Sequence, residues 1–118
     1  MENRKNVEDL VNMLKSGKYL EVFDKYYDDK VVMQENDNEA RVGKEVNRKY
    51  EEDFVNGIEK MHDSKILGYA TNGDYATIES FMELTHKEWG HVSMSEVSVQ
   101  HWKNGKIISE KFYYDPKK

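Results

Sequence analysis

The sequence contains no cysteine and a single proline, Pro116. Without cysteine the chain cannot form a disulfide, use a thiol as a nucleophile or hold a metal through thiolates. It also lacks proline-rich linkers, low-complexity segments and internal repeats. The 118 residues are therefore expected to form one domain, residues 1–118, which is large enough to bury a core without cross-links.

Long hydrophobic runs are missing as well. The first ten residues, MENRKNVEDL, do not resemble a signal peptide, and no stretch approaches a membrane-spanning length. We therefore expect a cytoplasmic protein without a membrane partner. The net charge is −5, and basic residues are mixed with acidic ones rather than clustered, which argues against binding to nucleic acid.

The sequence also shows no motif for a cofactor or a metal. Its glycines are scattered and form no phosphate-binding loop. His62, His86 and His91 lie near the ends of expected strands, and none has a partner at metal-ligand spacing. We predict neither a metal nor a cofactor.

What the sequence does contain is a strong hairpin signal near its C-terminus. In the stretch from His86 to Pro116, β-branched and aromatic residues alternate with polar ones on both sides of Asn104-Gly105. An Asn-Gly pair favours a tight two-residue turn. The pair Asn72-Gly73, followed by Asp74, predicts a second hairpin that joins strands over 62–71 and 75–86.

The first half of the chain carries helical patterns. An apolar stripe at helical spacing, formed by Val7, Leu10, Val11 and Leu14, predicts an amphipathic helix that ends at Gly17. A second helix is expected over 19–27. A third is expected over 43–56, with Val46, Tyr50 and Phe54 facing the core and Gly57 as its C-cap. The run 31–33 reads as a short strand, and 34–41 as a polar loop.

This order of elements predicts an α+β domain in which three helices close a curved antiparallel sheet. A gap between sheet and helices would suit a small molecule. Three helices cannot cover both faces of such a sheet. We therefore expect a homodimer through the uncovered face, which should carry Phe81, Trp102, Ile107 and Tyr113.

The passage "GKYLEVFDKYYDDKVVMQEN…RVGKE", the ending "WKNGKIISEKFYYDP" and the order of elements resemble the nuclear transport factor 2-like superfamily. The similarity is greatest to its SnoaL-like (polyketide-cyclase-like) and ketosteroid-isomerase-like branches, and it covers nearly the whole chain. It implies a cone of curved sheet closed by helices, often dimeric through the sheet. Members of the superfamily include isomerases, cyclases, dehydratases, hydrolases and purely binding proteins.

The resemblance also shows which catalytic groups this chain lacks. The general base of the isomerases falls on Gln34, and an amide cannot take a proton from carbon at neutral pH. Their oxyanion-hole tyrosine falls on Leu10, and the oxyanion-hole acid near Ser98 or Val99. The acid/base aspartate of the cyclases falls on Tyr113, a phenol with an ordinary pKa of about 10. We therefore expect no ketosteroid isomerase activity.

Candidate site residues follow from the pairing of the last two strands. A two-residue turn at Asn104-Gly105 would pair Val99 with Glu110 and place His101 diagonally beside Glu110 inside the cone. Such a carboxylate and imidazole could act as an acid/base pair or as a silent structural pair. A three-residue loop with a bulge would instead put Trp102 on that face in place of His101.

The expected catalytic residues are thus Glu110 and His101. The expected pocket lining is Tyr27, Gln34, Tyr50, Phe54, Val99, Phe112 and Tyr114. The expected ligand is a small apolar or aromatic molecule. Two functions remain open from the sequence: an acid/base enzyme of the isomerase, cyclase or dehydratase type, and a module that binds a ligand or a protein without chemistry.

Overall fold

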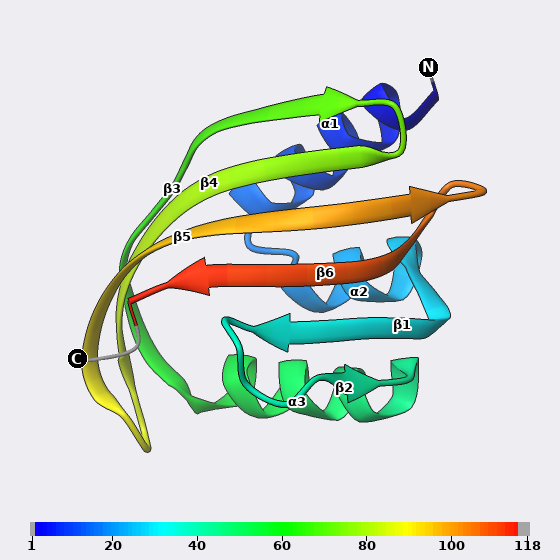
Figure 1. Ribbon diagram of the computed structural model, residues 1–118. Helices are drawn as coiled ribbons and strands as arrows, with labels where there is room; N and C mark the ends of the chain where they lie inside the picture. Colours follow the sequence, from blue (N-terminus) through cyan, green and yellow to red (C-terminus); the bar gives the residue numbers. More distant parts are fainter. Residues whose placement is uncertain (1, 116–118) are drawn as a thin grey trace.

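The computed structural model describes residues 2–115 and contains three helices and six strands (Figure 1). The elements follow one another as α1 (Glu2–Lys15), α2 (Tyr19–Tyr26), β1 (Tyr27–Glu35), β2 (Arg41–Val42), α3 (Lys44–Gly57), β3 (Ile58–Asn72), β4 (Tyr75–His86), β5 (Gly90–Lys103) and β6 (Lys106–Tyr114). The expected α+β class, with helices against a curved sheet, is confirmed. The two-residue strand β2 was not predicted, because two residues give no strand pattern: Arg41 is the last residue of the predicted loop, and Val42 precedes the predicted third helix.

The six strands form one sheet in the order β2-β1-β6-β5-β4-β3. Strands β3 to β6 form an antiparallel meander, whereas β1 pairs with β6 in parallel. The sheet is therefore mixed, and the expectation of a purely antiparallel sheet is wrong on this point. The parallel pair arises because α3 and the meander separate β1 from β6, so β6 returns alongside β1 in the same direction.

The helices pack on one face of the strongly curved sheet (Figure 1). The amphipathic stripe of α1 is confirmed, because Val7, Leu10 and Val11 are fully buried. From α2, Phe23 packs edge-on against Tyr27 with ring centroids 4.5 Å apart. These side chains meet the sheet in one hydrophobic core, formed by Val7, Leu10, Val11, Val22, Phe23, Tyr26, Tyr27, Val31, Met33, Ala76, Ile78, Trp102 and Ile107.

Helix α3 buries Asn47 rather than Val46, which corrects part of the predicted apolar stripe. Val46 is 54% exposed and Tyr50 is 40% exposed, whereas Asn47 is completely buried. The Asn47 side-chain amide donates to the backbone carbonyls of Gly43 (2.8 Å) and Arg41 (3.1 Å). The helix lies over the short strand β2, where backbone carbonyls must find hydrogen-bond donors, so a polar side chain is favoured there.

The last hairpin has the predicted two-residue turn, but a bulge follows it. Asn104 and Gly105 both have positive φ, 54° and 78°, as this turn requires. Trp102 pairs with Ile107, but His101 pairs with Ser109, so one extra residue lies on β6. Beyond the bulge, each residue of β6 is therefore opposite the β5 residue next to the one expected, so the β5 side chains that share a face with Glu110 are those of the other face.

Because of the bulge, two of the residues expected on the uncovered face of the sheet lie on the covered face instead. Trp102 and Ile107 are fully buried in the core rather than exposed. Val97 and Tyr113 are exposed, at 38% and 46%. Dimerisation through this face stays a prediction. Among the described residues, no helix is both long and apolar enough to cross a membrane.

Candidate functional site

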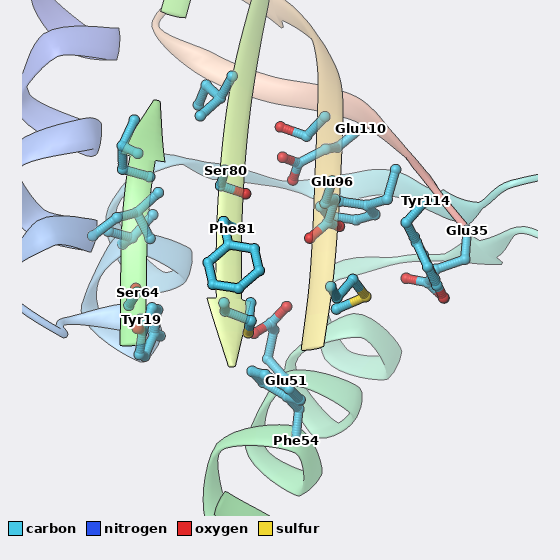
Figure 2. Close-up of a pocket in the computed structure, with 18 of the residues that line it drawn as sticks. Tyr19, Glu35, Glu51, Phe54, Ser64, Ser80, Phe81, Glu96, Glu110 and Tyr114 are labelled. Carbon is cyan, nitrogen blue, oxygen red and sulfur yellow. The ribbon is translucent and has the colours of Figure 1, made fainter. Parts of the chain in front are cut away.

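A cavity of about 820 Å³ lies between the helices and the curved sheet. All three helices and every strand except β2 contribute to its walls. Figure 2 shows aromatic rings and glutamates from opposite walls facing one another across this space. Aromatic walls come from Tyr19, Phe23, Tyr27, Tyr50, Phe54, Phe81, Trp89, Phe112 and Tyr114, and the lining glutamates are Glu35, Glu51, Glu96 and Glu110.

Glu110 of β6 is only 4% exposed and is fixed by a chain of hydrogen bonds. The Tyr27 hydroxyl donates to its Oε1, and the Gln100 amide donates to its Oε2 at 3.0 Å. Gln100 is held in turn, because its Oε1 accepts from the Trp102 indole at 3.0 Å. Burial raises the pKa of Glu110, and hydrogen bonds from Tyr27, Gln100 and Ser98 oppose that rise.

Glu35, at the end of β1, is paired and held rigidly. Its two carboxylate oxygens accept from the Arg41 guanidinium at 2.7 and 3.0 Å, a bidentate geometry. Arg41 also lies 3.6 Å from the centre of the Tyr50 ring and donates to Asn47 at 3.0 Å. The positive charge of Arg41 is therefore already committed to Glu35.

Glu51 of α3 and Glu96 of β5 differ from these two carboxylates. Within residues 2–115 neither makes a side-chain hydrogen bond or an ion pair, although both line the cavity. Burial, followed by the charge of Glu110, raises the pKa of Glu51 to about 7 and that of Glu96 to about 8. Both groups can therefore gain or lose a proton close to neutral pH, as general acid/base catalysis requires.

The cavity has the groups for proton transfer and for hydrogen bonding to a ligand. In the described part of the chain, no group of three or more His, Cys, Asp or Glu side chains is arranged to hold a metal ion. The chemistry available from these residues is thus that of carboxylic acids, phenols and an amide in an aromatic environment.

The predicted pocket residues divide between two faces of the sheet. Tyr27, Tyr50, Phe54, Phe112 and Tyr114 line the cavity. Glu110 lines it as well, whereas Gln34, Val99 and His101 lie together at a separate depression of about 290 Å³.

The structure contradicts the predicted Glu110 and His101 pair. Glu110 is opposite Gln100, and His101 is opposite Ser109, so successive residues of β5 place His101 on the other face. His101 stacks there on Tyr75, with ring centroids 4.7 Å apart. The physical reason is the single-residue bulge on β6. Without the bulge Val99 would be opposite Glu110, and with it Gln100 takes that place.

Sequence reasoning missed Glu51, Glu96 and Gln100. Once the bulge is known, strand alternation places Glu96, Ser98, Gln100 and Trp102 on the cavity face. Glu51 follows the buried Asn47 by four residues and precedes Phe54 by three, which puts all three on one face of α3. A sequence signal for Glu51 therefore existed, but the apolar stripe at Val46, Tyr50 and Phe54 masked it.

Comparison with known proteins agrees with this architecture. The SnoaL-like domain family matches residues 1–114. A search of curated proteins finds no significant match. A crystal structure of a candidate SnoaL-like polyketide cyclase from Mesorhizobium loti shares 30% sequence identity, with a TM-score of 0.88 over 97% of this chain and 100% of that one.

Two more distant structures share the fold. A nuclear transport factor 2-like protein of unknown function from Burkholderia pseudomallei is 12% identical, with a TM-score of 0.77 over 98% of this chain and 92% of that one. A protein from Catenulispora acidiphila with a ketosteroid-isomerase-like fold, solved in complex with trimethylamine, is 16% identical, with a TM-score of 0.68 over 82% and 75%. The family match over almost the whole chain, together with the fold that it shares with a nuclear transport factor 2-like protein, shows that this protein belongs to the SnoaL-like domain family.

Proposed function

We propose that this protein binds a small, largely apolar molecule in its cavity and exchanges a proton with that molecule through Glu96. The observation that carries the proposal is the cavity itself, whose aromatic walls hold a carboxyl group without a fixed partner. Its volume lies within the range of small-molecule sites, which measure about 300 to 1,000 Å³.

Glu96 suits the proton-transfer step better than Glu110. Both oxygens of Glu110 already accept hydrogen bonds, from Tyr27 and Gln100, so they are poorly placed to take a proton from a ligand. Glu96 has no such partner within residues 2–115, and its pKa of about 8 makes both protonation states available at neutral pH. Glu110 contributes a buried negative charge that helps to raise the pKa of Glu96.

The vacant positions of the ketosteroid isomerase pattern argue against the isomerase reaction in this cavity. Gln34 lies away from the cavity, so even a carboxylate at this position would not reach a ligand there. Any proton transfer must then use the glutamates of α3, β5 and β6.

A blocking variant tests the binding proposal. Ser80 lines the cavity, whereas Thr77 on the same strand is exposed. A panel of fluorinated aromatic fragments, followed by fluorine NMR, should give ligands that bind the wild type and Thr77→Trp but lose binding to Ser80→Trp. Equal binding of all hits to Ser80→Trp would place the binding site elsewhere and overturn the proposal.

Hydrogen exchange tests the catalytic part. Fragments that bind and carry a carbonyl group should exchange their α-hydrogens in D₂O faster with the wild type than with Glu96→Gln. Loss of a positioned base typically lowers the rate by about 10² to 10⁴. Binding without any catalysed exchange would overturn the enzymatic role and leave a binding module.

A further inference from the structure

The charges that line the cavity do not balance. Glu51, Glu96 and Glu110 all face this space, and the guanidinium of Arg41 is occupied by Glu35. The basic side chains that line the cavity are Lys65 and His91, and both are exposed.

Both of these exposed basic groups are already paired at the surface. The Lys65 amino group lies 3.4 Å from Asp63, and the His91 ring lies 2.7 Å from Glu83. Among the described residues, therefore, no cation forms an ion pair with Glu51 or Glu96, although the charges of Arg41 and Arg48 partly offset the rise in the pKa of Glu51. A buried carboxylate without a counter-charge is costly, and it either takes up a proton or waits for a positively charged partner.

Glu51 shows this situation most clearly. Its carboxylate is enclosed by protein, yet its side chain keeps some accessible surface, as expected of a group that faces a cavity. In Figure 2, Glu51 points from α3 toward the ring of Phe81 on the facing strand, with Phe54 beside it on the same helix. Negative charge and aromatic faces thus meet in the same part of the cavity.

Aromatic faces and carboxylates attract the same kind of group. The negative face of an aromatic ring binds ammonium ions, most strongly where water is excluded. The cavity already shows this preference at its edge, where the Lys65 amino group lies 5.8 Å from the centre of the Phe81 ring.

We propose that the ligand of this cavity is an organic cation, a small apolar or aromatic molecule that carries an ammonium group. Its charged nitrogen lies between Glu51 and Glu96, and its carbon frame contacts Phe54, Phe81 and Phe112. This inference rests on the proposed function and names the class of molecule that the same cavity takes.

The proposal predicts a definite sign for proton exchange on binding. Without a ligand, Glu51 and Glu96 hold protons below about pH 7 and pH 8. An arriving cation favours their ionised forms and expels those protons, so affinity rises with pH. A neutral ligand displaces water without adding a positive charge, which favours the protonated forms and gives no release.

Other ionisable groups around the two glutamates act in the background. They are Tyr19 and Tyr27, Glu35 and Arg41, Tyr50 and Arg48 of α3, Lys65, His91, Glu110, Tyr114 and Asp115. A quaternary ammonium probe is used because its own charge does not change with pH. The double variant Glu51→Gln/Glu96→Gln then separates the two glutamates from this background.

The experiment compares benzyltrimethylammonium with its neutral isostere, neopentylbenzene. Binding is followed by NMR between pH 6.0 and 8.5, and proton release by calorimetry of the cation in two buffers with different ionisation enthalpies. We expect the affinity for the cation to rise at least about tenfold over this range, with release of protons. The double variant should lose this pH dependence and bind the cation at least about tenfold more weakly at pH 8.5.

A matched control is Glu79→Gln, an exposed glutamate on β4, which should behave as the wild type. Equal affinity for the neutral isostere, or proton uptake with the cation, would overturn the cationic ligand and leave the cavity as a binding site for neutral molecules. Failure of the cation to bind at millimolar concentration would also overturn it. The fluorinated fragments and the Ser80→Trp variant would then decide separately whether the cavity binds anything.

Discussion

Replacing Glu96 with Gln should stabilise the protein at alkaline pH, because it removes a carboxylate that is costly to ionise in the folded state. Glu96 is a partly buried carboxyl whose pKa rises from 4.5 to about 8 on folding, first because of burial and then because of the charge of Glu110. Gln has nearly the same shape as protonated Glu and carries no charge. The variant therefore keeps the packing and removes only the cost of ionisation.

The sign and the size of this effect follow from proton linkage. Because the folded state holds this proton more tightly than the unfolded state, the stability that protonated Glu96 contributes is fully present below about pH 4.5 and is lost as pH rises through about 8. A pKa change from 4.5 to 8 corresponds to roughly 5 kcal/mol, at about 1.4 kcal/mol per pKa unit. Solvent in the cavity screens part of this, so we expect a gain of about 2 to 4 kcal/mol for Glu96→Gln at pH 8.5.

Urea unfolding of both proteins at several pH values from 4 to 9 measures the difference directly. The two free energies of unfolding should agree near pH 4 and diverge steadily above pH 5. The exposed Glu79→Gln serves as the control and should change stability by less than about 0.5 kcal/mol at every pH. Parallel curves for Glu96→Gln and the wild type over the whole range would refute the raised pKa of Glu96.

Three further predictions concern the surroundings of the site. Glu110→Gln should lower the pKa of both Glu51 and Glu96, because the charge of Glu110 is the second cause of their rise, and carboxyl carbon NMR of the variant measures it. Gly57→Ala should destabilise the fold by about 1 to 3 kcal/mol in urea unfolding, since its added Cβ would lie 2.2 Å from the ring of His86, which stacks on both Phe54 and Trp89; unchanged stability would mean that His86 moves freely. Asn47→Ala should cost about 2 to 4 kcal/mol, because it removes the buried amide that donates to the carbonyls of Gly43 and Arg41, and a loss below 0.5 kcal/mol would show that water replaces the amide.

Much of the fold could be predicted from local pattern. The stripe on α1 is continuous and apolar, and Asn104-Gly105 is a turn signal whose backbone requirement few other pairs meet. The resemblance in sequence added the order of elements and the expected cavity. These features depend on residues close together in the chain, where propensity and alternation are most reliable.

The site could be predicted only in part, because it depends on a single bulge. Ile108 is β-branched like an ordinary strand residue, and nothing in its neighbourhood marks it as unpaired. That one residue decides whether His101 or Gln100 meets Glu110. Register errors of this kind reverse every side chain beyond them, so the predicted acid/base pair was lost while Glu110 itself was placed in the cavity.

The interior glutamates escaped prediction for a different reason. Carboxylates are rarely buried without a partner, so Glu51 and Glu96 are assigned to the surface by any rule based on composition. Their position follows from tertiary structure: α3 packs mainly against β1 and turns Glu51 into the cavity, which β5 also lines. Groups that cost stability in this way often mark functional sites.

Carbon-13 NMR titration of the glutamate carboxyl groups in the unliganded wild type tests most directly whether the cavity holds carboxyls that exchange protons near neutral pH. We expect midpoints of about 7 for Glu51 and about 8 for Glu96. Midpoints close to the ordinary value of 4.5 for both residues would contradict this.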